Sequence, residues 1–285
     1  MKLQFNRPGI LLIFLSFTAL LAANAKADDQ TWSFGVLNQR SISLTAEYWN
    51  PILKYISQKS GVPLQLKMGK TAPETDAMIG QAKYDFVYSN TILTPANQPA
   101  GYQAFTRPIG PAIQGQIVTL ENSPIHSLKD LEQQEVGFPS LIAFTGYALP
   151  MNALLKEGIT VKPVFAGNQE GIMGQLKFGR VIAAGVNSMV MRDFAQRENI
   201  AYRVLWTSPP YLDLPIAAHP RVPQKIVAAL HAAFLGMSQD AEGIKILQAS
   251  AALIKQAPPL GFVPASNREY QNYREFFQTS RIKAP

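Results

Sequence analysis

The chain has 285 residues, with 26 Lys or Arg against 19 Asp or Glu, a formal net charge of +7 and no cysteine. The lack of cysteine excludes disulfides, thiol nucleophiles and thiolate metal sites. The basic residues form no Lys/Arg run, which argues against a nucleic-acid-binding protein.

The first 27 residues have the pattern of a cleavable export signal. Lys2 and Arg7 form a positive start, an apolar stretch reaches Ala23, and an Ala-Lys-Ala cleavage sequence ends at Ala27. The three basic residues lost with this segment lower the formal charge from +7 to +4. With no cysteine at the cleavage point for lipid attachment, we expect a periplasmic protein that is not a lipoprotein.

The first part of the mature chain alternates strand-like and helix-like segments, which is typical of α/β proteins. Buried or alternating apolar residues predict strands at 31–37, 63–68 and 84–89. Apolar residues at helical spacing predict helices at 46–61, 75–82 and 90–96, the first of them ended by Gly61. Glycine and proline are frequent at 101–111, and 114–120 is apolar, which predicts an extended crossing between two lobes.

The middle of the chain repeats this alternation. Ser127 followed by Asp130 predicts a capped short helix at 127–131. A strand ending at 135–138 then leads through a loop into a helix, for which Thr145 is the expected N-cap. The start of a helix offers unpaired amides to a small anion, although an ordinary strand–loop–helix connection has the same sequence features.

The remaining segments complete a second α/β unit and return to the first. The expected strands are 161–166, 181–186 and 202–206, the expected helices are 168–178, 188–197, 223–237, 240–253 and 267–279, and 209–216 is a second extended crossing. We therefore expect a signal peptide at 1–27, a first lobe from 28–110 and 209–285, and a second lobe from 111–208.

Several segments carry a family resemblance that extends over nearly all of residues 31–280. They are YWNPILKYISQKSGVPLQL, the SPIHSLKDL element, FTGYALP at the start of a helix, and WTSPPYLDLPIAAHPRVP. With these segments the chain resembles the phosphate/phosphite/phosphonate-binding proteins of ABC importers. The resemblance implies a type II periplasmic binding protein fold, in which two Rossmann-like lobes are joined by two extended hinge crossings.

The positions that hold the ligand in that family differ in this chain. A Ser-Thr-Ser trio that binds phosphonate oxygens corresponds to Ala143, Phe144 and Thr145, and only Thr145 keeps a hydroxyl. The two tyrosines of the family site correspond to positions near Ala72 and Ser89. Because a tetrahedral dianion needs many charge-assisted hydrogen bonds, we expect an oxyanion other than a phosphonate.

Other polar residues stand at the predicted carboxyl ends of strands, where ligands bind in open α/β sheets. Each has a plainer alternative: a solvated arginine for Arg40, helix capping for the serine, threonine and asparagine residues, and core packing for the aromatic ones. The family positions that hold an amino group correspond to the neighbourhood of Asn168, Gln169 and Asn187. The expected ligand-binding residues are Arg40, Ser41, Thr71, Ser89, Asn90, Thr91, Phe144, Thr145, Gly146, Tyr147, Asn168 and Asn187.

The sequence offers no catalytic or metal-binding arrangement. The three histidines, His126, His219 and His231, are scattered and form no pair at metal-ligand spacing. We expect no enzyme, no metal and no cofactor. The expected function is a monomeric periplasmic solute-binding protein that closes on a small anionic ligand and delivers it to an ABC permease. The alternative is a sensing or accessory protein of the same fold that acts with a sensor kinase or a redox complex.

Overall fold

The computed structural model describes residues 1–2, 4 and 30–282. The expected export signal at 1–27 therefore lies almost entirely outside the described residues. From residue 31 onward the chain is α/β and contains two separate sheets, as expected from the alternation of the sequence. Among the described residues, no helix has the length and apolar character needed to cross a membrane.

The first sheet has six strands in the order β11-β4-β10-β3-β1-β2. Parallel pairing joins β1 to β2 and to β3, whereas β10 runs antiparallel to β3 and β4. The strands are β1 (Trp32–Val36), β2 (Leu64–Lys67), β3 (Phe86–Tyr88), β4 (Gln103–Pro108), β10 (Ile216–Ala218) and β11 (Phe262–Pro264). We call the part of the molecule built on this sheet lobe I.

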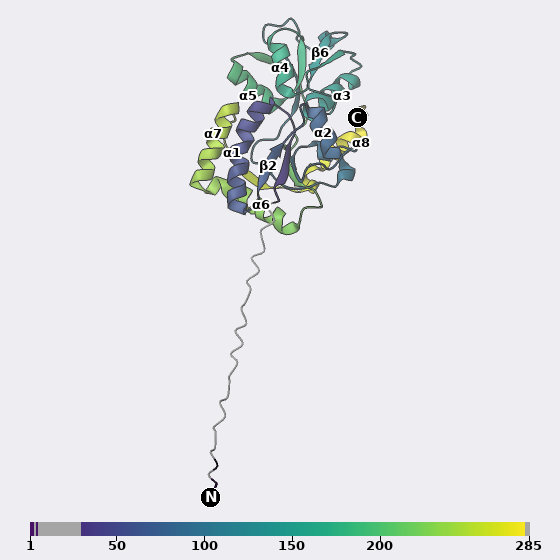
Figure 1. Ribbon diagram of the computed structural model, residues 1–285. Helices are drawn as coiled ribbons and strands as arrows, with labels where there is room; N and C mark the ends of the chain where they lie inside the picture. The colour runs from purple at the N-terminus through teal and green to yellow at the C-terminus, as the bar shows by residue number, and fades with distance from the viewer. Residues whose placement is uncertain (3, 5–29, 283–285) are drawn as a thin grey trace. The chain divides into compact units, whose positions relative to one another are not determined.

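The second sheet has five strands in the order β7-β6-β8-β5-β9. Its strands are β5 (Gly115–Leu120), β6 (Glu135–Phe138), β7 (Lys162–Phe165), β8 (Ala183–Asn187) and β9 (Tyr202–Thr207). We call the part built on this sheet lobe II. Figure 1 shows the elements of lobe II, such as α4, α5 and β6, above those of lobe I, such as α1, α2 and α6.

Lobe I contains five α-helices among the described residues: α1 (Ile42–Ser60), α2 (Ala72–Gly80), α6 (Gln224–Gly236), α7 (Ala241–Ile254) and α8 (Gln271–Thr279). Lobe II contains α3 (Leu149–Lys156), α4 (Gln169–Lys177) and α5 (Ser188–Glu198). Helix α1 begins at Ile42, four residues before the predicted start, because the Ser41 side chain accepts a hydrogen bond from the Leu44 amide and caps the helix.

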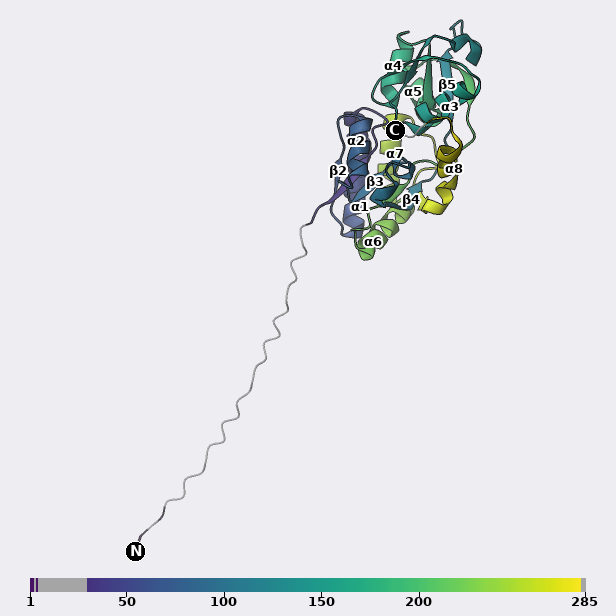
Figure 2. The same ribbon diagram turned by 90° about the vertical axis from the view of Figure 1, so that its right-hand side faces the viewer.

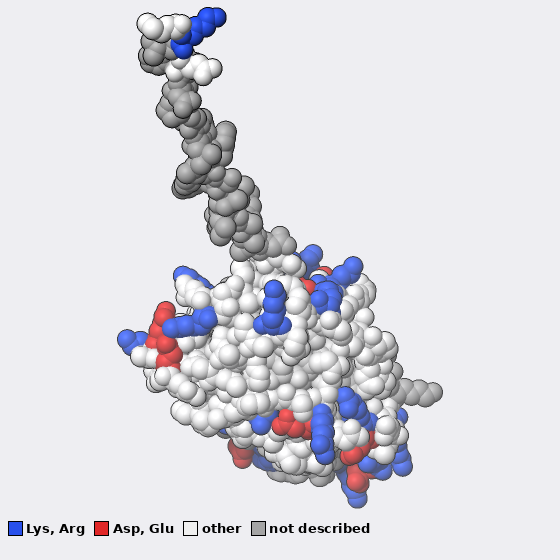
Figure 3. All heavy atoms as spheres, turned by 90° about the horizontal axis from the view of Figure 1, so that it is seen from below, with Lys and Arg blue, Asp and Glu red and all other residues white. Residues whose placement is uncertain are grey.

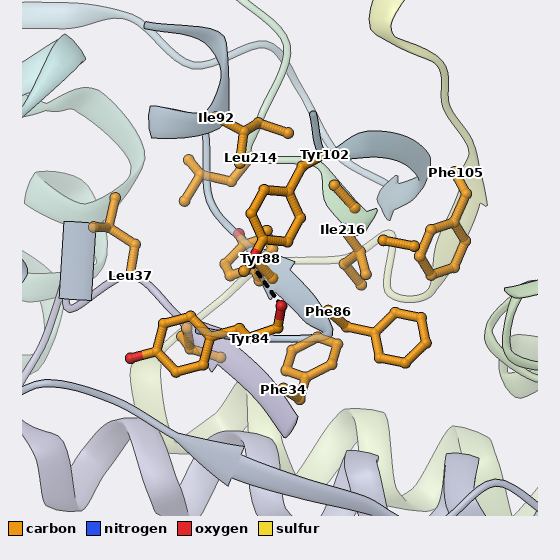
Figure 4. Packing of buried hydrophobic residues seen from close by; sticks show 14 of the residues in the cluster. Phe34, Leu37, Tyr84, Phe86, Tyr88, Ile92, Tyr102, Phe105, Leu214 and Ile216 are labelled. Carbon is orange, nitrogen blue, oxygen red and sulfur yellow. Dashed lines mark hydrogen bonds between the residues drawn. The ribbon is translucent and has the colours of Figure 1, made fainter. Parts of the chain in front are cut away.

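The core of lobe I forms between α1 and the sheet. Trp49 and Ile52 are buried on the predicted apolar face of α1, and the Trp49 ring lies 5.4 Å from the Phe34 ring of β1. Figure 4 shows part of this core, in which the Tyr102 hydroxyl donates a hydrogen bond of 2.7 Å to the Tyr84 carbonyl. Burial of such apolar surface stabilises the lobe, at roughly 25 cal/mol for each Å² removed from water.

The stretches expected as crossings contain strands that the sequence did not reveal. The first, 101–111 with 114–120, includes β4 and β5, and the second, 209–216, leads into β10, which pairs with β4. Strand β11 was also missed, and the helix expected at 90–96 is a 3₁₀ turn at Thr91–Leu93. Each of these strands is short, and β4 pairs with partners more than 100 residues further along the chain, so local periodicity cannot identify them.

The two chain segments that pass between the lobes are tied to each other. The Ile113 amide donates to the Tyr211 carbonyl over 2.7 Å, and the Tyr211 amide donates to the Ile113 carbonyl over 2.8 Å. This antiparallel bridge lies outside both sheets. It forms a paired connection between the two lobes.

The C-terminal helix and the residues that follow it contact lobe II. In both ribbon views α8 lies beside α3 (Figures 1 and 2). The Arg281 amide donates to the Asn152 side chain over 2.8 Å, and the Arg281 guanidinium donates to the Leu155 carbonyl over 2.7 Å. Helix α8 also borders the inter-lobe connection, because the Tyr273 hydroxyl donates to the Leu212 carbonyl over 2.7 Å.

Charged side chains are dispersed on the face seen in Figure 3. Lys and Arg lie mainly around the margin of that face, mixed with Asp and Glu, and a broad uncharged area occupies its centre. This distribution agrees with the absence of a basic run in the sequence.

Candidate functional site

Two cavities lie where loops of lobe I meet loops of lobe II. The smaller, of about 20 Å³, lies between Asn90 of lobe I and the 139–145 loop of lobe II, and we call it the amide cavity. The larger, of about 50 Å³, lies between Arg40 of lobe I and Asp193 of lobe II, and we call it the arginine cavity. Leu37 and Gln39 line both cavities, so the two are adjacent.

The cavities divide the twelve sequence-predicted residues into three groups. Asn90, Phe144, Thr145 and Asn168 line the amide cavity, and Arg40 and Asn187 line the arginine cavity. Six residues line neither cavity: Ser41, Thr71, Ser89, Thr91, Gly146 and Tyr147. The ligand-binding role of the whole set stays a prediction.

The amide cavity takes its name from backbone amides at the start of the helical segment that follows β6. Residues Phe144–Ala148 form a π-helical turn that continues into α3. The amides of Tyr147 and Ala148 both donate to the Ala143 carbonyl, over 2.8 and 2.9 Å. Among the described residues, no carbonyl or side chain accepts a hydrogen bond from the amides of Phe144 and Thr145.

Thr145 is not the N-cap that the sequence predicted. Ala143 precedes the helical segment, and no side chain caps it. The wide π-turn, in which an amide bonds to the carbonyl five residues earlier, includes Thr145 within the helical segment. The Thr145 side chain is buried at the wall of the amide cavity, where its hydroxyl makes no hydrogen bond to the described residues.

Gly146 is required by close packing. A Cβ atom at this position would lie 2.6 Å from the side-chain nitrogen, Nε2, of Gln169 and 2.6 Å from Pro139 Cγ. No side chain larger than hydrogen fits between these neighbours without a shift of the loop or of α4. Gly146 therefore lets the π-turn lie close to α4 and against Pro139 and Gln169, which line the amide cavity.

The amide cavity has a neutral wall. None of the described residues that line it is Lys, Arg, Asp or Glu. Asn90 and Asn168 supply side-chain amides, and Ser140 and Thr145 supply hydroxyls. Such a wall meets the charge of an anion with N–H and O–H dipoles, which are worth most where water is excluded.

Four of the predicted residues act as helix caps. Asn168 accepts from the Gly171 amide over 2.8 Å, and Asn187 accepts from the Met189 amide over 2.9 Å. Ser41 and Thr71 cap α1 and α2 in the same way and are exposed. These contacts show the capping role that the sequence offered as the alternative for these residue types.

Ser89 and Thr91 bond to each other. Their hydroxyl oxygens lie 2.9 Å apart, and the Thr91 amide donates to the Ser89 hydroxyl over 3.1 Å. Both side chains are buried. Their hydroxyls hold the turn that places Asn90 at the amide cavity.

Arg40 pairs with carboxylates of the opposite lobe. Its Nε lies 3.9 Å from a carboxylate oxygen of Glu170, and its Nη2 lies 3.9 Å from a carboxylate oxygen of Asp193. The neighbouring Gln39 carbonyl accepts a hydrogen bond from the Glu170 amide over 3.2 Å. The loop after β1 is thus attached to the start of α4 and to the middle of α5, and the positive charge of Arg40 is largely compensated.

The arginine cavity also contains a partly buried acid from the second crossing. Asp213 accepts hydrogen bonds from the Leu214 amide over 2.7 Å and from the Tyr88 hydroxyl over 3.4 Å. Burial raises the pKa of Asp213 above its ordinary value, opposed by these hydrogen bonds and by Arg40. Burial likewise raises the pKa of Asp193, opposed by Arg192 and Arg40. The carboxylates outnumber Arg40 here, so this cavity suits an oxyanion less well than the amide cavity does.

Phe144 forms the aromatic wall of the amide cavity and belongs to a larger aromatic cluster. Its ring centroid lies 4.8 Å from that of Tyr211 and 4.3 Å from that of Tyr273. The rings of Phe276 and Phe277 lie 5.2 and 5.7 Å away. The aromatic residue that replaces a hydroxyl of the family site therefore joins lobe II to the crossing and to α8.

Tyr147 packs inside lobe II. Its ring lies 5.3 Å from the Phe138 ring, in an edge-to-face arrangement, and 5.6 Å from the Phe165 ring. These contacts correspond to the core packing that the sequence left open as the alternative for this tyrosine. Sequence reasoning missed a different residue, Ser140, which follows β6 directly and lines the amide cavity. Its position one residue after Pro139 at a strand end is the signal that would have indicated it.

The sequence of the chain matches one family model over most of its length. This model describes the periplasmic substrate-binding proteins of ABC phosphonate transporters, and it matches residues 34–270. No curated protein matches the chain by sequence.

Solved structures with the same fold come from several bacteria. A binding protein component of an ABC phosphonate transporter from Pseudomonas aeruginosa superposes with a TM-score of 0.74 at 19% identity, covering 88% of this chain and 87% of that one. PhnD1 from Prochlorococcus marinus, in complex with methylphosphonate, has a TM-score of 0.72 at 16% identity, covering 87% and 97%. The periplasmic aliphatic sulphonate binding protein SsuA from Escherichia coli has a TM-score of 0.55 at 16% identity, covering 87% and 86%.

These matches confirm the expected two-lobed type II periplasmic binding protein fold. The family consists of transport binding proteins and not of enzymes. The sensing or accessory role that the sequence left open is not favoured by them.

Proposed function

Since the chain belongs to the family of periplasmic substrate-binding proteins of ABC phosphonate transporters, we propose that it binds a small oxyanion in the amide cavity and delivers it to an ABC permease. The observation that carries this proposal is the pair of unpaired amides, those of Phe144 and Thr145, at a cavity with a neutral, polar wall. Backbone amides at the start of a helical segment are good donors to anionic oxygens.

The geometry sets a condition on binding. A cavity of about 20 Å³ holds one or two water molecules. A tetrahedral oxyanion is therefore accommodated only when the lobes stand further apart than in this structure. In this proposal the lobes separate by rotation about the two crossings, which are paired at Ile113 and Tyr211.

The oxyanion class follows from the donors. Phosphonate, phosphite, phosphate and sulphonate groups share three or more oxygens that accept from N–H and O–H groups. Two of the three hydroxyls of the family site are absent at Ala143 and Phe144, which reduces the number of bonds available to a dianion. We therefore place a singly charged oxyanion ahead of a doubly charged one.

A thermal-shift measurement on the mature protein tests this proposal. Methylphosphonate, phosphite, phosphate, sulphate and methanesulphonate are compared, with glucose as a neutral control. An anion present at about 100 times its dissociation constant adds about 2.7 kcal/mol to the free energy of unfolding. For a chain of this size that raises the melting temperature by roughly 5–10 °C. If none of the five anions shifts the melting temperature more than glucose does, the oxyanion assignment is wrong.

A further inference from the structure

We infer that Ser140 is a ligand-binding residue, whose hydroxyl donates to the oxyanion and replaces one of the hydroxyls that positions 143 and 144 lack. This inference rests on the proposed function and adds to it a donor that the family resemblance does not indicate. Ser140 stands three residues before Ala143, outside the stretch that corresponds to the hydroxyl trio.

The first observation is the state of the Ser140 hydroxyl. The residue is only 4% exposed, and its Oγ is a buried atom without a hydrogen-bond partner among the described residues. A buried hydroxyl without a hydrogen-bond partner is unfavourable in a folded protein. Native proteins keep few such groups, and each one calls for an explanation, of which a bound ion is one.

The second observation is the position of Ser140. It lines the amide cavity together with Phe144 and Thr145, the residues whose amides are unpaired. The Ser140 carbonyl accepts a hydrogen bond of 3.2 Å from the Ala143 amide. This turn fixes the loop, so the hydroxyl is held at the cavity before a ligand arrives and little conformational entropy is lost on binding.

The third observation is the neutral wall of the cavity. No described lining residue carries a charge, so the affinity depends on the number of N–H and O–H donors. A serine hydroxyl supplies one donor. Each donor to an anionic oxygen in a site shielded from water contributes more than a hydrogen bond between neutral groups.

The chain provides a matched control. Ser250 of α7 is also a buried serine, 2% exposed, whose Oγ has no partner among the described residues. It lines neither the amide cavity nor the arginine cavity. Ser140→Ala and Ser250→Ala therefore make the same chemical change, one at the proposed site and one away from it.

The experiment measures affinity and stability separately. Isothermal titration with the same five anions, methylphosphonate, phosphite, phosphate, sulphate and methanesulphonate, gives the dissociation constants of the wild type and of both variants. Urea denaturation without ligand gives their stabilities. We expect Ser140→Ala to bind the preferred anion about 10- to 100-fold more weakly, while its ligand-free stability is equal to or above that of the wild type because an unpaired hydroxyl has been removed. Ser250→Ala should match the wild type in affinity.

Three results overturn the inference. Equal affinity of Ser140→Ala and the wild type removes Ser140 from the site and leaves the proposed function standing. A loss of affinity that is accompanied by an equal loss of ligand-free stability shows a structural role. If the wild type binds none of the five anions, the proposed function fails, and the role of Ser140 fails with it.

Discussion

Replacing Phe144 by serine tests the meaning of the altered binding loop. The substitution returns a hydroxyl to the family position, so resemblance alone predicts stronger anion binding. The structure predicts a different result, because Phe144 is only 4% exposed and packs against Tyr211, Tyr273, Phe276 and Phe277. Removal of a buried phenylalanine side chain costs about 3–5 kcal/mol, to which the edge-to-face contacts contribute.

We expect Phe144→Ser to lower the melting temperature by on the order of 10 °C, from about 3–5 kcal/mol and about 2–4 °C for each kcal/mol in a chain of this size. Circular dichroism during heating measures this change, and urea denaturation gives the free energy. Phe178→Ser is the matched control, since Phe178 is 74% exposed. Its effect should stay within about 0.5 kcal/mol. A Phe144→Ser protein with unchanged melting temperature and tighter phosphate binding would refute the reasoning.

Two further predictions concern charged groups. Arg40→Gln should lower the free energy of unfolding by about 1–3 kcal/mol, between the values for exposed and for fully buried ion pairs. The substitution removes the positive charge that Arg40 brings from lobe I to Glu170 and Asp193. These two carboxylates keep Arg197 and Arg192 of their own lobe as partners. Urea denaturation measures this, and lost anion binding at unchanged stability would instead make Arg40 a direct ligand. Burial alone would raise the pKa of Asp85, but hydrogen bonds from Ser33 and Arg221 lower that pKa on balance. Ionised Asp85 therefore stabilises the fold at pH values above the ordinary carboxyl pKa of about 3.9. This stabilisation is lost as the pH falls through the lower pKa of the folded state. Asp85→Asn should therefore be less stable than the wild type at neutral pH, and the difference should disappear in acid; a difference that is constant with pH contradicts this prediction.

Local signals in the sequence predicted many elements of the fold. Ser127 and Asp130 form the expected capping box, and Gly61 ends α1 in the left-handed conformation with a φ of 69°. These features depend on residues a few positions apart, so the sequence displays them directly. The sequence did not predict strand β10, because its three residues can be recognised as a strand only from their pairing with β3 and β4.

The candidate site was harder to predict for the same reason. The sequence indicated Thr145 and Asn90, and both line the amide cavity. The partners of Phe144 lie more than 60 residues away, in the second crossing and in α8, so its cluster could not be recognised from the chain order. The free hydroxyl of Ser140 depends on what surrounds it in space, which no spacing rule describes.

The packing of Phe144 affects motion beyond the amide cavity. The Phe144 ring borders the amide cavity, where the ligand is proposed to bind. The rest of its surroundings are formed by α8 and the second crossing. Displacement of the ring on ligand binding would disturb the packing of the C-terminal helix, since close-packed interiors transmit strain. Amide hydrogen exchange in Gln271–Thr279 should then report occupancy of a cavity that this helix does not line. The C-terminal helix would thus differ in amide exchange between the liganded and the empty protein.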